Sequence, residues 1–113
     1  MMNDCVFCKI ISGELPSKKV LETEDIIAIE DLNPNAPVHI LVMPKEHYDS
    51  ILVLKDEALM AKLLKAAQQV AKEQGIDESG CRIVTNVGED GGQSVSHLHF
   101  HVLGGKQLPL TLG

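Results

Sequence analysis

The stretch from His97 to Leu103 constrains this chain most, because three of its five histidines alternate there with large apolar residues. Successive side chains of a strand point to opposite faces, so the pattern predicts a strand that carries His97, His99 and His101 on one face. The apolar residues between them then face the core. Neighbouring imidazoles are expected to lie about 7 Å apart, which is close enough for them to share one small ligand.

A glycine-rich loop, residues 86–94, precedes this predicted strand. Its three glycines let backbone N–H groups approach an anion, and Gln93 and Ser94 can donate hydrogen bonds to phosphate oxygens. A glycine-rich loop alone is typical of a plain turn, but its position just before the histidines strengthens the interpretation. Together the two motifs indicate phosphoryl chemistry.

The composition indicates one acidic globular domain spanning residues 1–113. The chain is 44% hydrophobic with a net charge of −6, and a domain of this size would gain stability from oligomerisation. An acidic chain without a basic cluster argues against a nucleic-acid polymer as partner, so any nucleotide is expected to bind singly. The opening residues form no apolar run of signal-peptide or membrane-span length. We therefore expect a cytoplasmic protein with no membrane partner.

The hydrophobic periodicity predicts an α+β fold, in which a five-stranded antiparallel sheet is combined with one long and one short helix. Asp56 and Gly75 are expected to start and stop the long helix, and Asp4 to cap the short one. The strands flanking the proline-containing loop at 33–37 are expected to pair with each other. The predicted helices cover residues 5–12 and 56–74, and the predicted strands cover 20–22, 24–31, 38–43, 81–86 and 97–103.

The His-φ-His-φ-His-φ-φ pattern of residues 97–103, where φ is apolar, resembles the signature of the histidine triad (HIT) superfamily of nucleotide hydrolases and transferases. Four further segments, 7–11, 14–16, 31–39 and 91–95, resemble its Hint branch in order and spacing. The resemblance implies the HIT-like fold and a homodimer whose interface is formed by the long helix and the strand at 81–86. It also places the tail, residues 106–113, near the partner's active site.

The resemblance implies catalytic roles for five residues. His99 is the nucleophile that carries the nucleotidyl group, and His101 protonates or orients the leaving group. His97 and His39 form a hydrogen-bonded relay behind His99. Ser94 meets the charge that develops at phosphorus. Without the resemblance, His39 would be interpreted as a core histidine on an apolar strand.

The resemblance also implies the nucleotide contacts. Asp31 accepts hydrogen bonds from both ribose hydroxyls, and Leu32 lies beside the sugar. Asn86, Gln93 and Ser94 contact the phosphate, with loop-stabilising hydrogen bonds as the alternative interpretation. The base pocket, for which plain core is the alternative, would be lined by Val6, Phe7, Ile10, Leu15 and Ile29.

Cys5 and Cys8 form a Cys-x-x-Cys pair, which is half of a zinc site, although a redox motif or two reduced thiols are alternatives. The resemblance completes the site with His47 and His97 and implies a structural zinc ion. An odd number of cysteines in a chain without an export signal makes a structural disulfide unexpected. Cys81 is expected to be a buried apolar residue.

These observations predict a hydrolase that releases a nucleoside monophosphate from amine or acyl conjugates, purine nucleoside phosphoramidates among them. The reaction would pass through a nucleotidyl group on His99 and would use no catalytic metal. One alternative is a metal-dependent phosphohydrolase in which the strand histidines are the ligands. Another is a non-catalytic nucleotide-binding protein that regulates partners.

Overall fold

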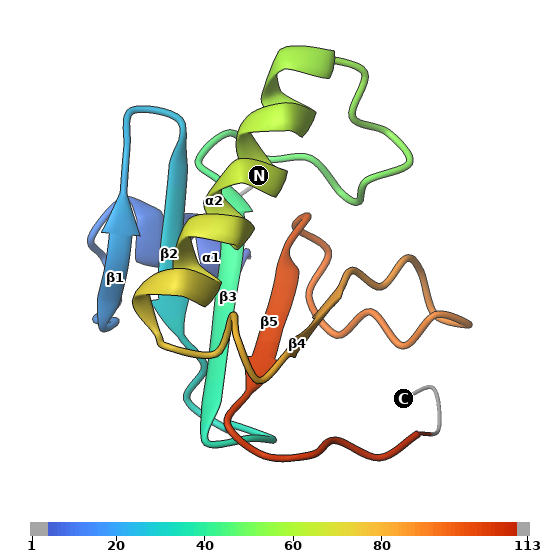
Figure 1. Ribbon diagram of the computed structural model, residues 1–113. Coiled ribbons are helices and arrows are strands. Elements are labelled where there is room, and N and C mark those ends of the chain that lie inside the picture. Colours follow the sequence, from blue (N-terminus) through green and yellow to red (C-terminus); the bar gives the residue numbers. More distant parts are fainter. Residues whose placement is uncertain (1–4, 111–113) are drawn as a thin grey trace.

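The computed structural model describes residues 5–110 and shows one five-stranded sheet with two helices (Figure 1). All neighbouring strands are antiparallel, in the order β1-β2-β3-β5-β4. The predicted α+β fold is therefore confirmed. The elements are α1 (Val6–Ile11), β1 (Lys19–Glu22), β2 (Ile26–Glu30), β3 (Val38–Pro44), α2 (Glu57–Glu73), β4 (Cys81–Val84) and β5 (Phe100–Gly104).

The two helices cover opposite faces of the sheet, α2 in front and α1 behind in the view of Figure 1. The alternation along β2 shows how both faces are buried. Ile26 and Ala28 belong to the apolar cluster under α2, whereas Ile27 and Ile29 belong to the cluster under α1. The central strands consequently divide the core into two layers, and the α1 side is the one that also holds the histidines.

The long helix α2 begins and ends where the sequence predicts. The Asp56 side chain accepts a hydrogen bond from the backbone N–H of Leu59, and Gly75 follows the helix with φ of 74°. Such a positive φ is the conformation that glycine adopts without strain. The helix buries Leu63 completely against the sheet. Among residues 5–110, no helix is both long and apolar enough to cross a membrane.

The last strand is shorter than predicted, because β5 begins at Phe100 and not at His97. The final β3–β5 pair is Val42 with Phe100. Two residues further along β3, Pro44 has no N–H to donate, and its carbonyl lies 3.0 Å from Nε2 of His97. The alternation of faces nevertheless persists through the irregular segment, since Leu98 packs in the α2 cluster with Phe100.

Two local predictions are corrected. Asp4 lies outside the described residues, and the side chain that caps α1 is that of Cys5, which accepts a hydrogen bond from the N–H of Cys8. Cys81 is exposed, not buried. It lies on β4, the edge strand, opposite Gly104, which has no side chain to cover it.

The burial of Leu63 makes a direct test of this packing possible. Leu63→Ala should lower the free energy of unfolding by about 2–5 kcal/mol, because it leaves a cavity between α2 and the sheet. The same substitution at Leu52, which is 75% exposed, should change stability by no more than about 0.5 kcal/mol. Urea unfolding followed by circular dichroism measures both, and equal losses would contradict the packing described here.

Candidate active site and metal centre

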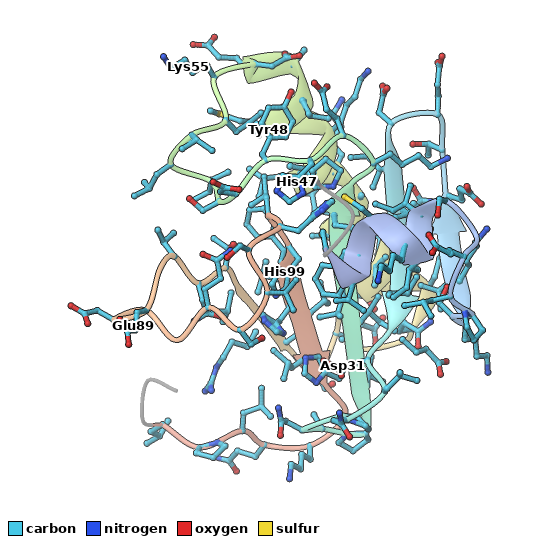
Figure 2. The ribbon with its side chains drawn as sticks, turned by 180° about the vertical axis from the view of Figure 1, so that it is seen from behind. Asp31, His47, Tyr48, Lys55, Glu89 and His99 are labelled. Carbon is cyan, nitrogen blue, oxygen red and sulfur yellow. The ribbon has the colours of Figure 1, made fainter. Side chains whose placement is uncertain are left out.

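All five histidines gather on the α1 side of the sheet and in the loops above it. Figure 2 shows His99 near the middle of this region, between His47 and Asp31, with Glu89 at the outer end of the glycine-rich loop. The rings of His99 and His101 have their centroids 4.9 Å apart. This is closer than the predicted 7 Å, which describes the spacing of backbone positions along a strand and not the reach of the rings.

The ring of His99 is held in one tautomer by the backbone. Its Nδ1 lies 2.7 Å from the carbonyl oxygen of His97, so Nδ1 carries the proton and donates it to that oxygen. The carbonyl of His99 itself accepts a hydrogen bond from the Thr85 hydroxyl at 2.7 Å, and the ring packs edge-on against Phe7. In the neutral ring, Nε2 therefore keeps its lone pair.

The ring of His101 takes the opposite tautomer through a chain of hydrogen bonds. The backbone N–H of Asn35 donates to Nδ1 of His39 at 3.1 Å, so the proton of neutral His39 is on Nε2. That proton faces Nδ1 of His101 at 2.9 Å. His101 must then carry its own proton on Nε2. Next to the lone pair of His99, the site thus offers an N–H donor.

His39, His99 and His101 are neutral near pH 7. Burial lowers the pKa of His101 to about 4, and the neighbouring His99 and His39 act in the same direction. Burial is also the main cause that lowers the pKa of His99 and of His39, while the negative charge of Asp31 opposes it. Neutral rings are what the two tautomer assignments require.

The predicted relay behind His99 is wrong in its connections. His39 bonds to His101 and not to His99. His97 supports His99 through its backbone carbonyl, while its ring points toward Cys5 and Cys8. The difference arises because His97 precedes β5 and lies in a bend, where its main chain and side chain serve two different sites.

Cys5, Cys8, His47 and His97 form a group that could hold a metal ion, since their ligand atoms all lie within 4.8 Å of one another. Nδ1 of His97 is 3.4 Å from Sγ of Cys5, and Nδ1 of His47 is 3.4 Å from Sγ of Cys8. Burial, followed by the adjoining Cys5, raises the pKa of the Cys8 thiol to about 11. A bound cation would reverse this and hold the sulfur as a thiolate.

Each of the two histidine rings in this group makes a hydrogen bond on the side away from the thiols, and these outer hydrogen bonds suit a metal ion. His97 places Nε2 3.0 Å from the carbonyl of Pro44, and His47 places Nε2 3.1 Å from the carboxylate of Asp49. Both rings can donate from Nε2 and keep a lone pair on Nδ1, directed at the thiols. Metal-ligating histidines commonly donate their other N–H to a carbonyl or carboxylate in this way.

A second group, Asp31, His39 and His101, also has its ligand atoms within 4.8 Å of one another. Its outer hydrogen bonds do not suit a metal ion. To coordinate through Nε2, His39 would have to move its proton to Nδ1, where it would face the N–H of Asn35. The arrangement favours a network of hydrogen bonds at this group.

Gln93 does not have the role that was predicted for it. Its side-chain N–H groups donate to the carbonyls of Asp49 at 2.7 Å and Val95 at 2.9 Å, and its side-chain oxygen accepts from Gly88 N–H at 2.8 Å. No donor of this amide is left for a phosphate. The loop-stabilising interpretation is the one that the structure shows.

Of the other two predicted phosphate contacts, Asn86 braces the loop and Ser94 is exposed. Asn86 donates to the carbonyl of Gly91 at 2.8 Å, which braces the loop internally. Ser94 is exposed at the base of the loop. The hydroxyl of Ser94 is therefore accessible to a phosphate, whereas the Asn86 amide already donates within the loop.

Some of the predicted nucleoside contacts are buried in the core and others are exposed. Phe7, Ile10 and Ile29 are buried in the α1 cluster, which agrees with the plain-core alternative. Leu32 is 84% exposed, and Val6 and Leu15 are each 37% exposed. Asp31 accepts from the N–H of Asn33 through Oδ1, while Oδ2 lies 3.4 Å from Nε2 of His39.

Comparison with known proteins agrees with this geometry. The model of the HIT domain matches residues 12–108. The chain belongs to the HIT family. An uncharacterised HIT-like protein of 13.2 kDa from Azospirillum brasilense is 49% identical over 106 residues, covering 91% of this chain and 87% of the relative.

Solved structures of HIT proteins superimpose closely. The HIT family hydrolase from Clostridium thermocellum is 45% identical, with a TM-score of 0.93 and 99% of each chain covered. A protein from Sulfolobus tokodaii, described as a hypothetical histidine triad nucleotide-binding protein, is 37% identical, with a TM-score of 0.81; the match covers 88% of this chain and 68% of that one.

Sequence reasoning missed the residues that orient the histidines in this HIT chain. Asn35 and Pro44 act through backbone groups, which leave no side-chain signature. Thr85 acts through its hydroxyl at the end of a predicted strand, where threonine is common for other reasons. Asp49 gave one available signal, because it is a carboxylate two residues after a candidate metal ligand.

The low pKa of His101 predicts how stability depends on pH. The unfolded chain protonates this histidine near pH 6.5, but the folded chain does so only near 4. The unfolded state thus binds more protons in that window, and the free energy of unfolding should fall as pH falls through it. Urea unfolding at several pH values should show a shallower decline for His101→Gln, which cannot titrate. Loss of metal affects both proteins alike, so identical slopes would contradict the assignment.

Proposed function

We propose that this HIT protein hydrolyses conjugates between a nucleoside monophosphate and an amine, with His99 as the nucleophile. The observation that carries the proposal is the pair of opposite tautomers, a lone pair on Nε2 of His99 beside an N–H on Nε2 of His101. A neutral imidazole with a free lone pair attacks phosphorus well, and the neighbouring donor stabilises the oxygen or nitrogen that gains charge.

The reaction proceeds in two displacements. Nε2 of His99 forms a bond to the α-phosphorus while the bond from phosphorus to the amine nitrogen breaks. The departing nitrogen accepts a hydrogen bond from Nε2–H of His101 and takes up one proton from solvent, so that it leaves as the amine. The ring of His99 is then positively charged, and Nδ1–H donates to the carbonyl of His97, which stabilises that charge. Water next attacks the same phosphorus, its proton leaves to solvent or a neighbouring ring, and the nucleoside monophosphate departs from His99.

Substrate binding in this proposal uses residues of the site that are at least partly exposed. Asp31 receives the ribose hydroxyls, and Leu32, Val6 and Leu15 contact a purine base and its sugar, because these apolar residues remain accessible. Ser94 and the backbone N–H groups of the glycine-rich loop contact the phosphate. The Sulfolobus tokodaii relative, described as nucleotide-binding, supports a nucleotide as the ligand.

The proposed metal at Cys5, Cys8, His47 and His97 is a structural zinc ion. Two sulfur and two nitrogen ligands form the set that zinc takes in closed, four-coordinate sites. Such an ion cross-links α1 to the loops before α2 and β5 and supplies folding free energy to a small domain. Catalysis would use no second metal.

The proposed assembly is a homodimer in the cytoplasm. β4 is an edge strand that leaves Ile83 43% exposed, and α2 leaves Leu64 53% exposed. A second copy that pairs along β4 would cover both the strand edge and this apolar surface. Arg82 on β4 donates to the carbonyl of Pro109, which holds the tail beside that edge. Residues 111–113 of the tail lie outside the described residues.

The nucleophile can be tested by trapping it. After brief exposure to an adenosine phosphoramidate, mass spectrometry should find an adenylyl group on His99, stable to base and labile to acid. His99→Ala should abolish turnover yet bind AMP with nearly unchanged affinity, because the nucleoside contacts remain. His101→Ala is the matched control, since it should form the adduct and lose more activity with amine than with phenolate leaving groups.

Two results would overturn this proposal. Full activity in His99→Ala would exclude His99 as nucleophile. Activity that disappears on chelation and returns in proportion to added metal, in protein whose fold is unchanged, would favour the metal-dependent phosphohydrolase. An adduct on His99 combined with metal-independent turnover of the folded protein supports the proposal.

The structural zinc ion predicts a different set of outcomes. Protein purified without added metal should contain about one zinc per chain by elemental analysis. Cys8→Ser should lower the zinc content and the melting temperature, whereas Cys81→Ser should leave both unchanged, because Cys81 is remote from the ligand group. Native protein without zinc, with all three thiols freely titratable, would contradict it.

A further inference from the structure

The segment that follows β3 contacts both the histidine segment before β5 and the glycine-rich loop. The carbonyl of Tyr48 accepts a hydrogen bond from Leu98 N–H at 2.7 Å, which fixes the main chain between His97 and His99. One residue later, the carbonyl of Asp49 accepts from the Gln93 side chain at 2.7 Å. The histidine segment and the glycine-rich loop are thus both tied to residues 48–49.

Gln93 is the residue that joins the loop to this segment. Its oxygen accepts from the N–H of Gly88, and one N–H donates to Val95, so it braces the two ends of the loop against each other. The other N–H reaches across 44 positions of sequence to Asp49. Asn86, by comparison, bonds only within the loop, to Gly91.

Asp49 is in turn connected to the metal-ligand group. Its carboxylate lies 3.1 Å from Nε2 of His47, while its backbone carbonyl holds Gln93. The side chains of His47 and Asp49 are 39% and 74% exposed, so a hydrogen bond between them competes with water and fixes little by itself. Coordination of His47 through Nδ1 would hold its ring in place and with it the Asp49 segment.

We propose that Gln93 is a positioning residue through which metal bound at Cys5, Cys8, His47 and His97 orders the glycine-rich loop. With metal in place, residues 47–49 are fixed, and Gln93 transmits that order to the backbone N–H groups of residues 88–95. Without metal the loop loses one anchor and binds anions less well. This inference rests on the proposed function for the metal at Cys5, Cys8, His47 and His97 and for the identity of the anion as a phosphate.

Amide hydrogen exchange provides a readout that does not depend on turnover. The backbone N–H of Gln93 donates to the Gly88 carbonyl. In the full chain, zinc loading should slow hydrogen exchange at this backbone N–H by roughly tenfold, the effect expected from one or two hydrogen bonds. In Gln93→Ala the zinc effect at that amide should vanish. Glu89→Gln is the matched control, because this exposed residue lies in the same loop, and it should keep the full effect.

Gln93→Glu keeps the contact of the side chain with Gly88 but removes the anchor to Asp49. Its carboxylate can still accept from Gly88 N–H but cannot donate to Asp49 or Val95. This variant should also lose the zinc effect on exchange. The affinity for AMP, measured by calorimetry, should fall by a similar factor on chelation of the wild-type protein and should respond little to chelation in either variant.

Several outcomes would overturn the inference. The loop amides of the wild-type protein could exchange equally fast with and without zinc, or Gln93→Glu could respond to zinc as strongly as the wild type. Protection of the α2 amides shows in each case that the chain is folded. If the zinc effect is found and depends on Gln93 but no adduct forms on His99, the coupling stands and the proposed hydrolase function fails.

Discussion

The hydrogen bond from Nδ1 of His99 to the carbonyl of His97 is the interaction on which the site depends. It requires that carbonyl to point back along the α1 side of the sheet, which a regular strand could not arrange while its carbonyls bond to neighbouring strands. The chain achieves this by leaving the ladder before Phe100, where Leu98 bonds to Tyr48. The irregularity before β5 is therefore what allows the backbone to fix the tautomer of His99.

Burial and hydrogen bonding act together on the histidines. Placing several imidazoles on one side of a small core disfavours their charged forms, which lowers the pKa of His39, His97, His99 and His101. Neutral rings must then share donors and acceptors in a consistent direction. Among the described residues, no buried side-chain nitrogen or oxygen lacks a hydrogen-bond partner. The tautomers follow from that requirement and from two backbone groups, Asn35 N–H and the His97 carbonyl.

Periodicity and composition predicted most of the fold, because the apolar runs of β2 and β3, the alternation in β5 and the caps of α2 are local signals. The grouping of Cys5, Cys8, His47 and His97 required the family resemblance, since nothing local relates positions 92 residues apart. The hydrogen bond of His39 to His101 and that of Gln93 to Asp49 were missed. Both depend on which backbone group lies nearby, and a side-chain pattern does not encode that.

The direction of the hydrogen bonds explains why two similar clusters of histidines have different chemistry. At His97 and His47 the outer partner is an acceptor, Pro44 or Asp49, so each ring directs a lone pair at the sulfur atoms. At His39 the outer partner is the N–H donor of Asn35, so the ring directs its proton at His101. One cluster is thereby arranged to receive a cation, whereas in the other the proton of His39 is directed at Nδ1 of His101. The direction of the hydrogen bond on the far side of each ring therefore separates the group that could hold a metal ion from the hydrogen-bonded histidines beside it.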